Sequence, residues 1–430
     1  MKKIISVALV ASVVAGLATA DAKITLNWRQ QGTAWDWTKK TETPKVGDET
    51  TTSTVDWVNF NSYGGSADSF KFVFSGDMAG ATLELNPDYT GGNISIKQYN
   101  AFVKFGDLTL SGGKWGDGFA DGGYRVKKDV DAMNANGQDF ERFKLGSMFT
   151  ASPSKYMDDL TKSNAVSGVA EYSLGLNDDM KLNLALAAFD NAFDTVKDED
   201  GNDTTTTNYK AGWSARAQFN MSGLFNSEFI VRKENSKTNA FGLYFQPTMV
   251  DGLTATIGGA LAMQKNGGKD KDGKTDDEVF WNVDLRLRYQ VMDPLSITFF
   301  TNISGATSDG GQKIGSGLAG IKGGDGWANS AVVKMAMWNN LSARYKINDT
   351  FTATLNLGLI TALAGSDLKT EEKADNGIEW RVTPAVQIYA NSASSIWIGF
   401  AFSGSSWTDK TEKDISLFSI ALPVVFRVKM

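Results

Sequence analysis

The feature that most constrains this chain is a two-residue alternation of apolar and polar side chains, repeated in one run after another. In residues 279–291 the odd positions are apolar, while the even positions from 282 to 290 are all polar. Successive side chains of a β-strand point to opposite faces, so each run predicts a strand with one apolar face. No run reads as apolar on both faces, as strands buried between two layers do. The pattern favours an all-β protein built from one antiparallel sheet.

The runs number about eighteen, with sixteen as the alternative, and their connections alternate in length. Short ones such as residues 292–294 and 348–350 take turns with long polar ones such as 264–278 and 305–331. A soluble sandwich of that many strands would be unusually large. Closure into a barrel pairs every backbone N–H and C=O, as hydrocarbon requires. We therefore predict a transmembrane antiparallel β-barrel over residues 21–430, with short periplasmic turns and long extracellular loops.

Three regions are less regular. The first strand is predicted at residues 23–29, followed by a polar, Thr-rich segment to about residue 53, and residues 54–63 could be strand or loop. Residues 191–208 are expected to be solvated loop, and the apolar positions of residues 332–338 do not alternate cleanly.

Tryptophans near strand ends are expected to form interfacial girdles: Trp28, Trp115, Trp213, Trp281, Trp338, Trp380 and Trp397.

The N-terminus predicts export. Lys2 and Lys3 precede an apolar stretch, and Ala18-Thr19-Ala20 forms an A-x-A cleavage site. This arrangement is typical of a secretory signal peptide over residues 1–20, cleaved near Ala20. The apolar stretch is shorter than the ~20 residues that span a bilayer as a helix. We expect an exported protein of the cell outer membrane.

Composition excludes several functions. The chain contains no His and no Cys, so it offers no imidazole general base, no Ser-His-Asp arrangement and no thiolate. Loss of two lysines with the leader changes the formal charge from −6 to −8, which disfavours nucleic acid as a partner. Residues 198–203 and 269–278 resemble calcium loops only loosely. We predict no enzyme activity, no cofactor and no metal site.

The longest irregular segment, residues 116–163, follows a predicted hairpin of residues 94–105 and 108–115 that turns at Gly106-Asp107. Connections usually take about 4–6 residues, so a segment of this length is usually functional or disordered. We predict that it folds into the barrel and forms the constriction, because opposed charges across a pore sort solutes. The candidate constriction residues are Arg125, Lys127, Lys128, Asp129, Asp131, Asp139, Glu141 and Arg142.

Strand parity assigns a second set of charged residues to the lumen wall. Placing Arg or Lys on the lipid face near the midplane would cost about 2–4 kcal/mol each. The candidate wall residues are Arg29, Lys71, Lys104, Arg216, Asp284, Arg286, Arg288, Glu379 and Arg381. Whether the pore prefers anions or cations stays open.

Residues 97–115, KQYNAFVKFGDLTLSGGKW, and residues 69–85, SFKFVFSGDMAGATLEL, resemble hairpins of the general porins of Gram-negative outer membranes. The chain departs from that family by ending in FRVKM rather than in an aromatic residue. The resemblance implies a diverged porin whose third long loop narrows the lumen. It also implies the barrel-assembly machinery as a partner and, by analogy only, a homotrimer.

The predicted function is therefore a water-filled channel in the outer membrane for passive diffusion of small hydrophilic solutes and ions. Its partners would be outer-membrane lipid and those solutes. The alternative is a non-conducting surface protein or adhesin that uses the barrel as an anchor.

Overall fold

The computed structural model describes residues 21–59, 69–88, 93–115, 160–161, 165–190, 195–197, 203–205, 212–234, 237–314, 326–367, 376–391, 394–409 and 411–429. The signal peptide prediction and most of the long segment 116–163 lie outside these residues.

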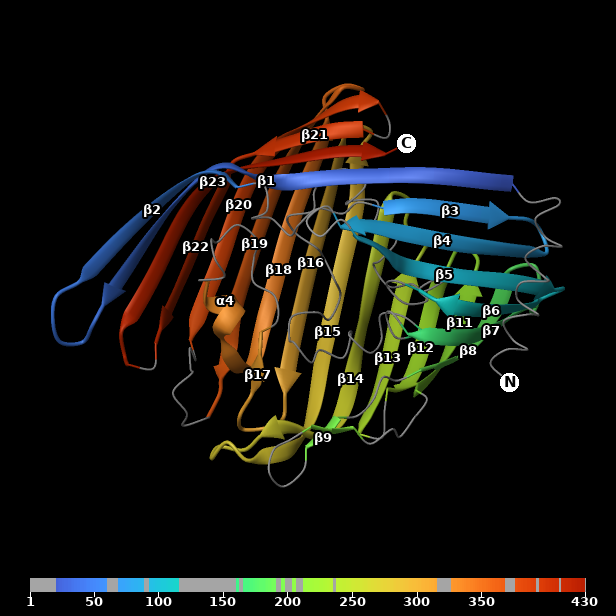
Figure 1. The fold of residues 1–430 in the computed structure, drawn as a ribbon, viewed down its shortest axis with the longest axis horizontal. Coiled ribbons are helices and arrows are strands. Elements are labelled where there is room, and N and C mark those ends of the chain that lie inside the picture. Colours follow the sequence, from blue (N-terminus) through green and yellow to red (C-terminus); the bar gives the residue numbers. More distant parts are fainter. Residues whose placement is uncertain are drawn as a thin grey trace.

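All the strands except β9 and β10, which pair with each other, form one antiparallel sheet that closes on itself (Figure 1). β1 (Asp21–Thr43) pairs with β23 (Asp414–Lys429) along most of its length, so the first and last strands are neighbours. The sheet counts 21 strands, but three of them continue another strand of the ring. β2 (Thr50–Asn59) and β3 (Ser69–Ser75) both pair with β1, one after the other along the same edge. In the same way, β21 and β22 both lie between β20 and β23. β17 continues the line of β16, since both pair with β18. The closed ring therefore has eighteen strands, which confirms the predicted fold and the larger of the two predicted counts.

The other strands of the first half are β4 (Ala79–Asp88), β5 (Asn93–Phe105), β6 (Leu108–Lys114), β7 (Val166–Gly175), β8 (Met180–Phe189), β9 (Thr195–Lys197), β10 (Asp203–Thr205), β11 (Gly212–Met221), β12 (Phe225–Lys233) and β13 (Thr238–Pro247). Those of the second half are β14 (Leu253–Lys269), β15 (Thr275–Met292), β16 (Leu295–Ala306), β17 (Gln312–Lys313), β18 (Val332–Lys346), β19 (Phe351–Gly365), β20 (Gly377–Asn391), β21 (Ser394–Gly399) and β22 (Ala401–Thr408). A short helix, α4 (Trp327–Ser330), precedes β18.

The two faces of the sheet differ as the alternation predicts. On β15, Val283 is 51% exposed on the outer face, whereas its neighbour Asp284 is 1% exposed on the inner face. Leu243 and Phe229 are likewise exposed on neighbouring strands. A continuous apolar outer face suits hydrocarbon, and the inner face holds the charged side chains.

The short turns also agree with the prediction. β5 and β6 meet at Gly106-Asp107, and Gly106 has a φ of 60°, which favours glycine. In the β18–β19 turn the side-chain oxygen of Asn348 accepts hydrogen bonds from the N–H groups of Thr350 and Phe351, both at 2.9 Å. Such Asx turns close a hairpin with few residues.

Several boundaries correct the sequence-based predictions. β1 continues to Thr43 and β2 begins at Thr50, because Trp35 and Trp37 pair with Trp57 and Val55 and because threonine favours strands. The predicted loop 191–208 contains the paired strands β9 and β10. The uneven pattern in residues 332–338 reflects register shifts between β18 and β19, which change the face that each residue presents.

The tryptophan prediction holds only in part. Trp28 and Trp213 are exposed, and Trp380 contacts Phe418 on the outer face. Trp115, Trp338 and Trp397 are buried instead, which corrects the girdle assignment for these three. The parity of a strand, rather than the residue type, decides which face a tryptophan takes.

No helix among the described residues is long and apolar enough to cross a membrane.

Candidate functional site

The inner wall carries two parallel rows of charge, one acidic and one basic. Asp284 and Arg286 are successive inward residues of β15, and Glu379 and Arg381 are successive inward residues of β20. The strand register places Arg286 and Arg381 in one row, with three strands between them, and Asp284 and Glu379 in the next. With strands about 4.8 Å apart, the members of a row lie roughly 19 Å from each other, and the rows are about 7 Å apart. We call these the acidic row and the basic row.

Hydrogen bonds fix the acidic row. The side-chain amides of Asn282 and Asn302 donate to the two carboxylate oxygens of Asp284. The hydroxyl of Ser304 in turn donates to the amide oxygen of Asn302 at 2.7 Å. A carboxylate that is 1% exposed needs such donors, because burial without them would cost several kcal/mol.

The basic row is held in a similar way at β20. Arg381 is fully buried, and its Nε donates to the hydroxyl of Thr383 at 2.8 Å. Glu379, one row away, is also fully buried and accepts a hydrogen bond from the backbone N–H of Ala328 in α4 at 3.1 Å. Hydrogen bonds therefore anchor Asp284, Glu379 and Arg381 on the wall.

A third charged group lies on β7 and β11, on either side of β8. Nη2 of Arg216 is 3.3 Å from Oε1 of Glu171, although β8 runs between their strands. Ala185 occupies the position between them, and its small side chain lets the two groups meet. On the neighbouring strands Gln218 donates to Glu228 at 2.7 Å.

The end of the long segment lies against this part of the inner wall. The carbonyl of Leu160 accepts a hydrogen bond from the hydroxyl of Ser214, and the carbonyl of Thr161 accepts one from Arg232 at 3.4 Å. Leu160 is 1% exposed and packs in the cluster that contains Val169 and Ile230. Leu160 and Thr161 thus lie inside the barrel.

A second connecting segment also lies inside the barrel. In Figure 1, α4 lies beside the strands of the inner wall, and the N–H of Trp327 donates to the hydroxyl of Ser405 at 2.9 Å. The buried indole packs with Ile360 and with Phe300 and Trp338, whose rings meet edge to face at 5.7 Å. This helix belongs to residues 305–331, which the sequence pattern predicted as an ordinary long connection.

The predicted wall residues occupy several environments. Arg216, Asp284, Arg286, Glu379 and Arg381 are buried on the inner face, and Arg288 and Lys71 are half-buried. Lys104 is exposed, with its ammonium 5.5 Å from the ring centre of Phe102. Arg29 lies in β1. Their role in selecting solutes stays a prediction.

The candidate constriction residues lie outside the described residues: Arg125, Lys127, Lys128, Asp129, Asp131, Asp139, Glu141 and Arg142.

Sequence reasoning missed several inward charges, of which four lie beside groups already described. Glu171, Glu228 and Arg232 face the lumen beside the residues named above, and Arg344 donates to the hydroxyl of Tyr389 at 2.6 Å. All four lie at inward positions of the two-residue alternation in their strands. Applying that alternation to every strand would therefore have found them. Among the residues that the structure describes, no group of three or more acidic side chains could hold a metal ion.

No protein-family model matches the chain, and no curated protein matches its sequence. Similar solved structures include Pseudomonas aeruginosa OccK3 (OpdO), with a TM-score of 0.48 and 11% identity over 98% of this chain and 99% of that one. Pseudomonas aeruginosa OprD gives 0.46 and 10% over 95% and 96%. A loop-deletion mutant of OmpT from Vibrio cholerae gives 0.43 and 12% over 95% and 99%.

Proposed function

We propose that this protein is an outer-membrane porin, a water-filled channel through which small hydrophilic solutes and ions diffuse passively. The closed ring of eighteen strands, apolar outside and charged inside, is the observation that supports the proposal. Barrels of sixteen or more strands are wide enough for an aqueous channel. The acidic and basic rows act on ions in the lumen through their electric field rather than by contact, since the four side chains are at most 2% exposed.

The lumen would be narrowed by two connecting segments. Leu160 and Thr161 contact the inner wall at β11 and β12, which supports an inward course for residues 116–163. α4 is attached to the wall at β20 and β22. In this proposal both segments restrict the pore. The charges of the acidic and basic rows act on solutes that pass between the two segments.

The partners follow from the same proposal: membrane lipid around the apolar face, and solutes and ions within. The protein would act as a channel and not as an enzyme. Insertion by the barrel-assembly machinery and a homotrimeric state remain expectations from the resemblance to porins.

Planar-bilayer recording tests the proposal. The purified full-length protein should insert with discrete conductance steps, and deletion of residues 116–163 should enlarge those steps. A folded, heat-modifiable protein that inserts without discrete steps would refute the channel and favour the non-conducting anchor. Steps of unchanged size in the deletion variant would refute the constriction.

A further inference from the structure

An amide side chain lies on the outer, lipid-facing wall of the barrel. Asn339 of β18 is half-buried on the outer face, since its neighbours in the chain, Trp338 and Asn340, are buried on the inner face. The residues directly opposite it are Thr301 on β16 and Leu359 on β19. The side chain of Asn339 forms no hydrogen bond with any residue that the structure describes. The wall therefore presents an unbonded polar group to the membrane.

The strand register places Asn339 within the hydrocarbon layer. Trp281 and Tyr289 are outward residues of β15, and Leu285 lies midway between them, roughly 14 Å along the strand from each. Outward aromatic residues mark the two edges of the hydrocarbon. The row of directly paired residues that starts at Leu285 passes through Asn339 and ends at Trp380, the outward tryptophan of β20. Because barrel strands are tilted, this row rises from the middle of the hydrocarbon to its edge, and Asn339 is halfway along it.

An amide at this depth needs a hydrogen-bonding partner. It has two N–H donors and a carbonyl oxygen with two lone pairs, and hydrocarbon offers a partner for none of them. A bond to the hydroxyl of Thr301 would still leave one N–H of Asn339 without an acceptor. The remaining groups therefore favour a contact with a polar side chain from outside this barrel.

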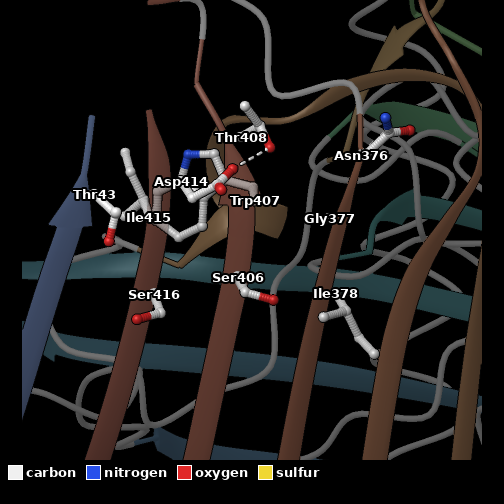
Figure 2. A pocket seen from close by; sticks show the side chains of 10 residues that line it. All are labelled: Thr43, Asn376, Gly377, Ile378, Ser406, Trp407, Thr408, Asp414, Ile415 and Ser416. Carbon is white, nitrogen blue, oxygen red and sulfur yellow. Dashed lines mark hydrogen bonds between the residues drawn. The ribbon is translucent and has the colours of Figure 1, made fainter. Parts of the chain in front are cut away.

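A pocket at the rim of the barrel does not include this face. It has a volume of about 430 Å³ and lies where the ends of β20, β22 and β23 approach the end of β1 (Figure 2). Its lining combines inward Trp407 and Ile415 with outward Ser406 and Ser416, so it lies at the rim and not on the lipid-facing wall. Asn339 is not among its lining residues, so this pocket supplies no partner for the amide.

We propose that the outer face around Asn339 pairs with the same face of a second copy of this chain, through reciprocal hydrogen bonds between the two Asn339 amides. An amide is both a donor and an acceptor, so two amides satisfy each other. Two copies inserted in the same direction are related by an axis along the membrane normal. Every residue then keeps its depth, and Asn339 meets Asn339 in an isologous contact. Met337 and Leu341, the next outward residues of β18, would pack across this contact.

Photocrosslinking between copies tests the pairing. Leu341→benzoylphenylalanine places a photoreactive side chain two residues from Asn339 on the same face. The full-length protein is folded into phosphatidylcholine vesicles, irradiated and resolved on a denaturing gel as it is diluted with lipid. We expect a crosslinked dimer. Asn339→Leu in this background should move the dilution midpoint about tenfold toward higher protein-to-lipid ratios, whereas Asn339→Gln, which keeps the amide, should move it little.

Two control variants separate the role of this face from non-specific contact. Leu186→benzoylphenylalanine places the same side chain on the outer face of β8, which is separated from β18 by β11 to β16, and should give no dimer. Ser227→Leu is the matched control for Asn339→Leu, because it also replaces an outward polar residue by leucine but lies near the short-turn end of β12. It should leave the dilution midpoint unchanged.

Absence of a dimer from position 341, an equal dimer yield from position 186, or an unchanged midpoint in Asn339→Leu would each overturn the proposal. The pairing rests on the proposed function only in that the barrel spans a membrane, and it leaves each lumen open. Conductance of the same preparations therefore separates the two proposals. Protein that pairs without conducting would refute the channel alone, and protein that conducts without pairing would refute the pairing alone.

Discussion

The indole of Trp327 in α4 lies over Gly377 of β20, where a Cβ added to residue 377 would stand 2.3 Å from the ring. Gly377→Ala should therefore push α4 away from the wall, at a cost of about 1–3 kcal/mol for overpacking. We expect the amide hydrogens of Trp327 and Ala328 to exchange at least about fivefold faster, because their bonds to Ser405 and Glu379 weaken.

Gly168→Ala is the matched control for this substitution, since a Cβ there would meet nothing within 4 Å. Unchanged exchange at Trp327 in Gly377→Ala would show that the close approach does not hold α4 in place.

The basic row should affect the charge preference of the pore. Arg381→Gln removes a positive charge from the inner wall, and a unit charge about 7 Å from an ion in water is worth about 0.6 kcal/mol. We expect the cation-to-anion permeability ratio, measured from reversal potentials in a salt gradient, to rise by up to about sevenfold, because the lost charge acts with opposite sign on cations and anions. Asp284→Asn should shift it the opposite way.

Lys346→Gln provides the control for a charge outside the wall rows, because Lys346 is 58% exposed at a turn and pairs with Asp349 at 2.6 Å. A shift of equal size in this control would show that the inner rows have no special effect.

Ala185 lies on β8, between the strand of Glu171 and the strand of Arg216, and its small side chain leaves room for these two residues to meet. Ala185→Leu should force these side chains apart and destabilise the barrel by about 1–3 kcal/mol. Thermal unfolding of the purified protein would measure this loss. Ala188→Leu adds the same side chain on the exposed face of the same strand and should have little effect. Equal losses in both variants would contradict the role given to Ala185.

The turn between β22 and β23 should respond to acid. Burial tends to raise the pKa of Asp409, but hydrogen bonds from the hydroxyl and N–H of Thr411 and from the N–H of Lys413 outweigh it, and the pKa is lowered from 3.8. Because the folded pKa is depressed, its stabilisation is present above pH 3.8 and is lost as the pH falls through the folded value.

The amide chemical shifts of Thr411 and Lys413 should therefore change on acidification below pH 3.8. In Asp409→Asn this change should be absent, because the amide does not titrate in this range. A wild-type profile that matches the variant would contradict the turn's dependence on the carboxylate.

The alternation in residues 279–291 was enough to predict the strand β15, its apolar outer face and the inward position of Asp284 and Arg286. This worked because a strand has a fixed period of two, and because one face of the sheet is apolar and exposed while the other carries the polar side chains inside the ring. The same rule failed near Val333, where register shifts change the face, and it did not distinguish outward Trp380 from inward Trp338 by residue type.

The all-β class, the one-sided strands and the alternation of short and long connections follow from the amino-acid sequence, since these depend on local side-chain order. Which residues of distant strands become neighbours follows from the folded barrel alone. Ring closure and strand register together produce three such relations. They are the contact between Glu171 and Arg216, the packing of Trp327 on Gly377, and the common row of Arg286 and Arg381. Those relations arise from pairing between strands far apart in the chain, for which a single strand's pattern contains no information.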